Sequence, residues 1–261
     1  MDDAAGEART SLDAILGGRL RLRQPLDGHR VGADAVLLAA AAGAPARRLV
    51  DVGAGVGAVG LALLQRWPEA LGDLVEIDPA LAALARENAA LNRLEARARV
   101  IAADALGAPD RRAAGLADGK ADLVVTNPPF FDARNVRASP DARRARAHVA
   151  PAREGAASPL EAWIVACLAL LAPGGRFVMI HRPDALGAIL AAIGRRLGGV
   201  ALLAVLPRAG ENAHRLLICG VKGSKAPLRI APPLALHEAS GASTARAEAI
   251  HRGEATIDWQ E

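Results

Sequence analysis

The chain alternates short apolar runs with longer amphipathic stretches from residue 48 onward. Such alternation is typical of a parallel sheet that helices cover on both faces. The apolar runs predict strands at 48–53, 73–77, 98–102, 121–126 and 175–181. The stretches between them predict helices at 56–66, 79–92, 159–171 and 183–197, and three of these begin with a Pro, which suits a first helical turn.

Two later apolar runs, 200–206 and 215–221, flank a polar turn and predict an antiparallel hairpin that closes one edge of the sheet. The predicted fold is therefore α/β and Rossmann-like, with a mostly parallel seven-stranded sheet and an antiparallel C-terminal hairpin. A dinucleotide-binding fold differs, because its second half repeats the first. We expect residues 1–45 to pack on the core as a strand and helix extension, 46–222 to form the main domain, and 223–261 to form a tail with a possible strand at 228–230 and a short helix at 244–251.

The segment before the sheet carries two polar features. Arg19, Arg21 and Arg23 recur at every second position, so a strand there would present all three on one face, toward either a substrate or solvent. Asp34 precedes the helix-forming run 35–42 and is expected to be its N-cap.

Composition supports a globular protein with one main core. The chain has 261 residues, 52% of them hydrophobic, and a net charge of +4. All but three of the 32 basic residues are Arg, which suits phosphate or nucleic acid, although a biased genome would produce the same excess. Cys167 and Cys219 lie in apolar runs and are expected to be core thiols.

Several classes of protein are disfavoured by the same sequence. The six His are scattered without ligand spacing, so we expect no metal site. The N-terminus is acidic and no apolar segment follows it, and the longest apolar stretch is shorter than the roughly 20 residues of a bilayer span. We therefore expect a cytoplasmic protein with no membrane partner and no obligate protein partner.

A glycine turn follows the first strand of the predicted sheet, in Asp51-Val52-Gly53-Ala54-Gly55-Val56-Gly57. Its glycines let the backbone approach a ligand, and the N–H groups of the next helix face the same point. Gly55, Gly57 and Gly60 also match a dinucleotide fingerprint, so the turn alone indicates only a nucleotide-like cofactor. Asp51 adds information, because a carboxylate there disfavours a pyrophosphate and favours the ammonium group of a methionine moiety.

Acidic residues follow the next two predicted strands. Glu76, at the end of the second strand, is placed to accept the two hydroxyls of a ribose, a role found in nicotinamide and S-adenosylmethionine proteins alike. Asp104, after the third strand, is placed to accept a hydrogen bond from an adenine amino group. A turn or N-cap role would also explain Asp104, and for this residue taken alone it is the favoured interpretation.

The fourth predicted strand ends in Asn127-Pro128-Pro129-Phe130, in a chain with three Phe and no Tyr. The two prolines fix the backbone and lack N–H donors, so the turn offers carbonyl and amide acceptors. The ring of Phe130 suits stacking on a planar base. In an open α/β sheet, ligands bind at the carboxyl ends of the strands, so we expect this turn and the glycine turn to face one crevice.

This order of motifs resembles that of class I S-adenosylmethionine-dependent methyltransferases, and more narrowly the amino-methyltransferases with an Asn-Pro-Pro-Tyr or Asn-Pro-Pro-Phe turn. The segments 28–38 and 211–217 are similar to those of bacterial tRNA1(Val) adenine-37 N6-methyltransferases, and the likeness covers most of the chain from about residue 12. It implies S-adenosylmethionine as the cofactor, a methyltransferase domain at 46–222, and a place beside the cofactor for Asp34.

The resemblance also implies a substrate and a reaction. The methyl group would go to an exocyclic amino group in RNA, with adenine N6 of tRNA as the first expectation. Asn127 and the Pro128 carbonyl would accept the two amine protons, and Phe130 would stack on the base. The Arg residues at 134–153, together with Arg19, Arg21 and Arg23, are candidate phosphate contacts.

Three other functions remain open at this point. A protein glutamine N5-methyltransferase uses the same acceptor logic, although only about 45 residues precede the first strand of the sheet and little there suggests a protein-docking domain. Guanine N2-methylation of rRNA belongs to the same chemical class. A nicotinamide-binding oxidoreductase would explain the glycines but not the Asn-Pro-Pro-Phe turn.

Overall fold

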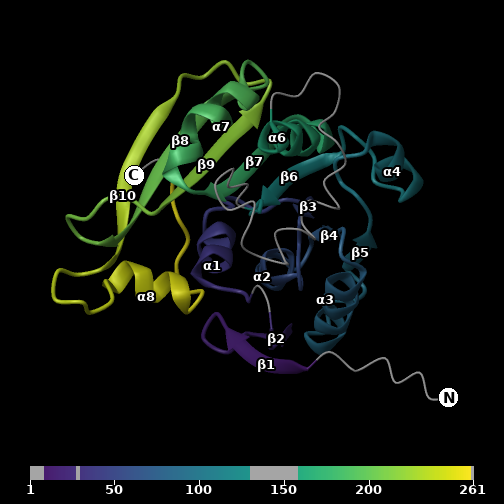
Figure 1. Ribbon diagram of the computed structural model, residues 1–261, viewed down its shortest axis with the longest axis horizontal. Helices are drawn as coiled ribbons and strands as arrows, with labels where there is room; N and C mark the ends of the chain where they lie inside the picture. The colour runs from purple at the N-terminus through teal and green to yellow at the C-terminus, as the bar shows by residue number, and fades with distance from the viewer. Residues whose placement is uncertain (1–8, 28–29, 130–157, 260–261) are drawn as a thin grey trace.

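The computed structural model describes residues 9–27, 30–129 and 158–259. An eight-stranded sheet crosses the centre of the molecule (Figure 1). Its strands are β3 (Arg48–Val52), β4 (Leu71–Glu76), β5 (Ala98–Ala102), β6 (Ala121–Thr126), β7 (Leu171–His181), β8 (Leu197–Arg208), β9 (Arg215–Lys222) and β10 (Arg229–His237). They are arranged in the order β10-β8-β9-β7-β6-β3-β4-β5.

The predicted α/β, mostly parallel architecture is confirmed. Strands β3 to β7 are the five predicted parallel strands, and β9 runs antiparallel between β7 and β8. The predicted number of seven strands and the position of the hairpin at the edge are wrong, because β10 pairs in parallel with the outer side of β8. Pro232 and Pro233 interrupt the strand pattern of β10 and coincide with a register shift between Ala231 and Leu234, which an edge strand tolerates.

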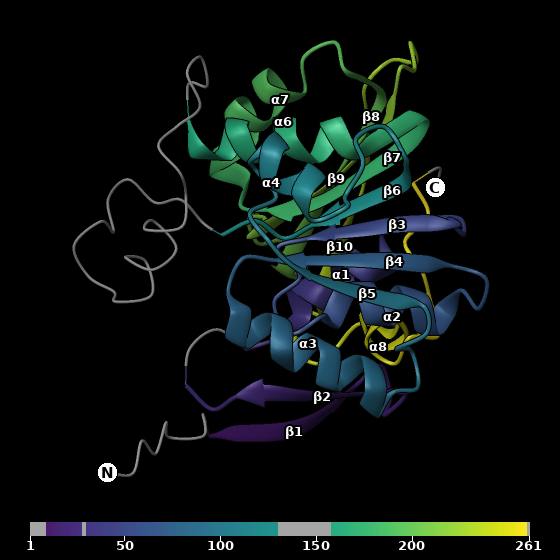
Figure 2. The ribbon, with the colours of Figure 1, turned by 90° about the vertical axis from the view of Figure 1, so that its right-hand side faces the viewer.

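Helices cover both faces of the sheet (Figures 1 and 2). On one face lie α1 (Ala33–Ala40), α2 (Ala58–Arg66), α3 (Pro79–Leu91) and α8 (Ala245–His251), and on the other lie α4 (Ala108–Ala113), α6 (Pro159–Leu170) and α7 (Leu186–Ile193), which follows the short 3-10 turn η1 (Pro183–Ala185). Successive side chains of a strand point to opposite faces of the sheet, so Leu49 of β3 packs into one core and Val50 into the other.

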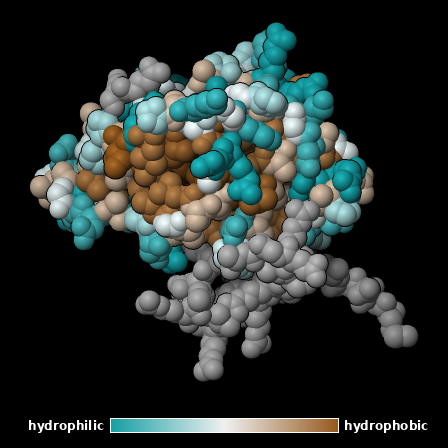
Figure 3. Space-filling view, turned by 90° about the horizontal axis from the view of Figure 1, so that it is seen from above, coloured by the Kyte–Doolittle hydropathy of each residue, from teal (hydrophilic) through white to brown (hydrophobic). Residues whose placement is uncertain are grey.

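Local sequence explains where the main helices begin. Asp78 caps α3 by accepting the Ala80 N–H at 2.8 Å, Ser158 caps α6, and each helix has a Pro in its first turn. Apolar residues gather on the surface on the α6 and α7 side of the molecule (Figure 3). Within the described ranges, no helix combines the length and the apolar character that crossing a bilayer requires.

A separate hairpin precedes the sheet, formed by β1 (Thr10–Ile15) and β2 (Leu20–Pro25). Leu20 and Leu22 point into the core, so Arg21 and Arg23 lie on the outer face, as the alternation predicts. Arg19 lies in the turn before β2 and donates to the Gly253 carbonyl at 2.9 Å.

Two amide side chains of α3 hold the edge of β2. Asn88 Oδ1 accepts the N–H of Arg23 at 2.6 Å while its Nδ2 donates to the carbonyl of the same residue at 3.0 Å. Asn92 makes the equivalent pair of bonds with Arg21, at 3.0 and 2.7 Å. The two amides therefore bond the backbone of β2 as a neighbouring strand would, and they fix the hairpin to the core. The domain boundaries at 45 and 222 stay a prediction.

Candidate active site at the carboxyl ends of β3, β4, β5 and β6

The register of the sheet brings the predicted site residues to one edge. Val52 pairs with Val75 on one side and with Thr126 on the other, and Glu76 pairs with Ala102. The segments that follow these positions are the glycine turn, Asp104 and the Asn127 turn. They therefore leave the sheet side by side at the edge where open α/β folds bind ligands.

The glycine turn has a backbone that favours glycine at three positions. Gly53, Gly55 and Gly57 have φ values of 73°, 56° and 90°, in the left-handed region. A Cβ on Gly55 would meet no atom within 4 Å, so the turn is open there to an approaching ligand. A Cβ on Gly53 would lie 2.9 Å from Cζ2 of Trp163, so this position is closed by an indole ring.

Glu76 is buried beneath the glycine turn. Its Oε2 accepts the Gly55 N–H at 2.8 Å, and its Oε1 accepts the Asp78 N–H at 2.9 Å. Burial raises the pKa of the carboxyl, against the lowering effect of these backbone bonds. Each carboxylate oxygen can accept more than one hydrogen bond, so this geometry leaves acceptor capacity for ribose hydroxyls.

Asp51 lies deeper than the sequence suggests. Its side chain is almost fully buried, and its Oδ2 accepts the Gly60 N–H in the first turn of α2 at 2.8 Å. Its pKa is raised to about 7, mainly by burial and also by the charge of nearby Glu76, against the lowering effect of the Gly60 N–H. Asp51 thus holds the start of α2 against the end of β3. Its attraction for an ammonium group stays a prediction.

Asp104 is partly exposed and accepts the Leu106 N–H through Oδ1 at 2.8 Å. This bond matches the turn role that was one of its two interpretations. The other carboxylate oxygen offers an acceptor at the end of β5 for a ligand amine.

The expected N-cap role of Asp34 is wrong. Helix α1 begins at Ala33, its N-cap is Gly32, and no side chain caps it. Asp34 lies in the first turn and accepts a hydrogen bond from Nε of Arg215 at 2.8 Å, with both side chains less than a quarter exposed. The pair joins the segment around 28–38 to the segment 211–217, the two segments that the resemblance singled out.

The Asn127 turn is anchored on its strand side. Asn127 is half-buried, Pro128 buried and Pro129 exposed. The Thr126 hydroxyl donates to the Val52 carbonyl at 2.8 Å and accepts the indole N–H of Trp163 at 2.9 Å.

Two sets of predicted contact residues lie outside the described residues. They are Phe130 and the Arg residues between 134 and 153. Their roles in stacking and in phosphate binding stay predictions.

Trp163 is the site residue that sequence reasoning missed. It lies on α6, where the helical pattern indicates only a core-facing position, yet it contacts both the first glycine of the turn and the residue before Asn127. The one feature of the sequence that could have drawn attention to Trp163 is the rarity of its type, since the chain has three Trp and few aromatic residues.

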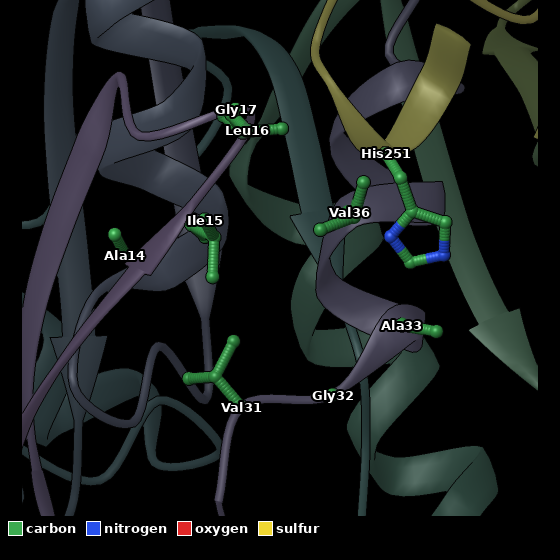
Figure 4. Close-up of a pocket in the computed structure, with 9 residues that line it drawn as sticks. All are labelled: Ala14, Ile15, Leu16, Gly17, Val31, Gly32, Ala33, Val36 and His251. Atoms are coloured by element: carbon green, nitrogen blue, oxygen red, sulfur yellow. The ribbon is translucent and has the colours of Figure 1, made fainter. Parts of the chain in front are cut away.

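A second hollow lies away from these residues, between the β1–β2 hairpin and the N-terminal end of α1 (Figure 4). It has a volume of about 320 Å³ and is lined mainly by aliphatic side chains, with His251 of α8 at one side. None of the predicted donor or acceptor residues lines it.

The residues present fit the nucleoside part of a cofactor. The backbone at Gly55, after β3, is open to a ligand, Glu76 at the end of β4 lies beside it, and Asp104 follows the neighbouring strand β5. Together with the mostly parallel sheet, this arrangement defines a class of protein, the Rossmann-like α/β methyltransferases.

Comparison with known proteins gives the family. The profile of the methyltransferase small domain family matches residues 31–166, more than half of the chain. The chain belongs to this family of methyltransferases, which implies S-adenosylmethionine as the methyl donor.

Several curated relatives share one name, tRNA1(Val) (adenine(37)-N6)-methyltransferase. The protein from Porphyromonas gingivalis strain W83 is 37% identical over 162 residues, and the match covers 60% of this chain and 60% of that protein. The protein from Aeromonas hydrophila is 35% identical over 193 residues, covering 72% of this chain and 75% of the relative. The first match thus spans less than two thirds of the relative's length.

Solved structures agree on the fold. A predicted O-methyltransferase from Agrobacterium tumefaciens is 33% identical, covers 86% of this chain and 98% of its own, and superposes with a TM-score of 0.71. A 16S rRNA N2 methyltransferase from T. thermophilus, solved with AdoMet and guanosine, is 21% identical with a TM-score of 0.53, covering 82% of this chain and 50% of its own. The second likeness concerns the fold alone.

Proposed function

We propose that this protein transfers a methyl group from S-adenosylmethionine to the exocyclic amino group of adenine, at N6, in a tRNA. One observation carries the proposal: the register of β3 with β6 sets the Asn127-Pro128 acceptors beside the glycine turn of the donor side. The names of the curated relatives support adenine as the base and tRNA as the substrate.

The donor side would be formed by residues of three strand ends. The backbone of Gly53 to Gly57 would face the methionine part, Glu76 the ribose hydroxyls, and Asp104 the adenine amino group of the donor. When bound there, S-adenosylmethionine supplies a methyl group on a sulfonium centre. Asp51 would contribute indirectly, by fixing the first turn of α2 through Gly60.

The acceptor side addresses a specific chemical problem. The lone pair of an exocyclic amino nitrogen is delocalised into the base, so the nitrogen is a poor nucleophile. If Asn127 Oδ1 and the Pro128 carbonyl accept its two protons, the nitrogen is drawn toward tetrahedral geometry and its lone pair becomes directed. Pro128 has no N–H and a fixed φ, so its carbonyl is presented without a competing donor.

Proton transfer does not require a strong base in this scheme. The methylated nitrogen carries a positive charge and is acidic, so it can lose a proton to water or to the same two acceptors. A base in RNA must also leave its stack, which costs a few kcal/mol, and stacking on Phe130 would return about 1–3 kcal/mol. Because these two quantities nearly cancel, contacts to the RNA backbone must supply most of the affinity.

The outer face of the hairpin is a candidate for such contacts. Arg21 is exposed there, and Arg23 lies 3.4 Å from the carboxylate of Glu87 with half of its side chain exposed. The Asn88 and Asn92 amides hold their backbone, so the two guanidinium groups extend from a fixed platform. Affinity should fall as the salt concentration rises, and each phosphate contact should steepen the plot of log affinity against log salt by nearly one unit.

The proposal is tested by nucleoside analysis of tRNA from a strain that lacks this protein. We expect N6-methyladenosine to fall at one tRNA position and to return on expression of the wild-type chain, but not of Asn127→Ala. A loss of 2-methylguanosine instead would assign the protein to guanine. Unchanged nucleosides, together with a loss of methylglutamine in a protein, would refute the proposal.

A further inference from the structure

One side chain of α6 contacts the glycine turn and the strand residue that directly precedes the Asn127 turn. The indole N–H of Trp163 donates to Thr126 Oγ1 at 2.9 Å, and Thr126 directly precedes Asn127. On the other side, its Cζ2 and Cη2 atoms lie 2.9 and 3.0 Å from the position that a Cβ on Gly53 would occupy. The ring therefore packs against the first glycine of the donor-side turn.

The same hydroxyl continues the connection between the two turns. Thr126 is fully buried, and its Oγ1 donates to the carbonyl of Val52, the residue before Gly53, at 2.8 Å. The hydroxyl thus accepts one bond and donates one, which uses its single proton. A hydrogen-bonded relay, half-buried at Trp163 and fully buried at Thr126, runs to the Val52 carbonyl and lies beside the start of both turns.

We propose that Trp163 is a positioning residue that sets the spacing between the donor-side glycine turn and the Asn127 acceptors. The inference rests on the proposed function and adds a residue to it. The sheet alone fixes Val52 beside Thr126, but both turns begin one residue later, where the ladder ends. The indole packs on Gly53 just past the end of that ladder and donates to Thr126, the last β6 residue before Asn127, so one ring contacts the chain at the start of both turns.

Methyl transfer is sensitive to this spacing. A displacement of about 1 Å in a reacting pair can lower a rate by about 10²-fold, because the near-attack geometry is lost. The contact also gives Gly53 a second reason to be glycine. Any side chain there would push against the ring and move one turn away from the other.

A role in packing alone predicts a different pattern of effects. A core aromatic residue contributes to the free energy of unfolding wherever it lies, and its loss should not change turnover by the molecules that stay folded. Trp67, 5% exposed at the end of α2, provides the matched control. Replacing Trp67 by Phe should lower the melting temperature and leave kcat unchanged.

The test compares three variants of the relay with that control. Trp163→Phe keeps a ring and removes the N–H donor, Thr126→Val removes the hydroxyl at constant shape, and Thr126→Ser restores it. We expect Trp163→Phe and Thr126→Val each to lower kcat about 10-fold or more while the KM for S-adenosylmethionine changes less than about 3-fold. Thr126→Ser should recover most of kcat. If Trp163→Phe does not fold, the kcat of Thr126→Val alone tests the positioning role.

Binding measurements separate this inference from the function on which it rests. Calorimetry with S-adenosylhomocysteine should show binding to the wild type, and the same addition should change a tryptophan emission that Trp163→Phe lacks. Normal binding with wild-type kcat in both Trp163→Phe and Thr126→Val would overturn the positioning role and leave the proposed function standing. A wild-type protein that does not bind S-adenosylhomocysteine would overturn both.

Discussion

Replacement of Glu76 tests how one carboxylate serves both the fold and the donor. In Glu76→Ala the N–H groups of Gly55 and Asp78 lose their acceptors at 2.8 and 2.9 Å. Hydrogen bonds to charged groups contribute about 1.5–3 kcal/mol each, but Gly55 and Asp78 are partly exposed, so water replaces part of that energy. We expect the free energy of unfolding to fall by about 2 kcal/mol.

The effect of Glu76→Ala on binding of the methyl donor should be larger than its effect on the free energy of unfolding. Loss of two hydrogen bonds from ribose hydroxyls to a carboxylate corresponds to about 3 kcal/mol, or roughly a 100-fold weaker Kd. Glu76→Gln is not a mild change here. Its amide has one oxygen for two backbone donors, so its NH₂ group must face the N–H of Gly55 or of Asp78. We expect Glu76→Gln to weaken binding at least 10-fold.

Isothermal calorimetry with S-adenosylhomocysteine measures both variants, with thermal melting to show that each is folded at the temperature used. Glu95→Gln, on an exposed residue after α3, is the control and should bind as the wild type does. Wild-type affinity in Glu76→Ala would show that the carboxylate does not contact the donor and would refute the assignment.

Three further predictions concern other residues of the same edge. Asn127→Ala should lower kcat by about 10²-fold or more and leave S-adenosylhomocysteine affinity within a factor of about 3, since only a preorganised acceptor is lost; an unchanged kcat would remove Asn127 from the chemistry. The raised pKa of Asp51, about 7 against an ordinary 3.8, means that the folded state holds the proton more tightly, so its stabilising effect is present below pH 4 and is lost as the pH rises to 7. Urea unfolding from pH 4 to 8 should therefore show the wild type losing about 4 kcal/mol relative to Asp51→Asn, whereas parallel curves would contradict the burial argument. A double-mutant cycle with Asp34→Asn and Arg215→Gln should give a coupling energy of about 1 kcal/mol, and a value near zero would mean that the pair does not join the two segments in solution.

The sequence predicts the sheet well because its signal is local. An apolar run that lies between turn residues needs no distant partner to be recognised, so β3 to β9 and the helices α2, α3, α6 and α7 follow from patterning, whereas the short helix α4 is not predicted. The order of motifs then places the glycine turn, Glu76, Asp104 and Asn127 at one edge, because parallel strands share a direction. Strand β10 is predicted only in part, as a possible strand at 228–230, because Pro232 and Pro233 argue against its continuation and only its place at the sheet edge permits one.

The site contacts that sequence analysis missed are those between residues far apart in the chain. Asp34 looks like a helix cap because it precedes an Ala-rich run, but its partner Arg215 is 181 positions away. The pattern of α6 marks Trp163 as a core residue, and nothing local indicates that its ring will meet Gly53. In the same way, Asn88 and Asn92 read as polar positions on a helix, whereas the fold uses their amides to hold β2.

Transfer of a deuterated methyl group would show whether this protein methylates adenine N6 in tRNA through Asn127. Purified protein is incubated with CD₃-labelled S-adenosylmethionine and unmodified tRNA transcripts, and the digested nucleosides are analysed by mass spectrometry. We expect the label to enter N6-methyladenosine with the wild type and to be nearly absent with Asn127→Ala. Label in any other nucleoside, or equal label from the two proteins, would contradict the proposed function.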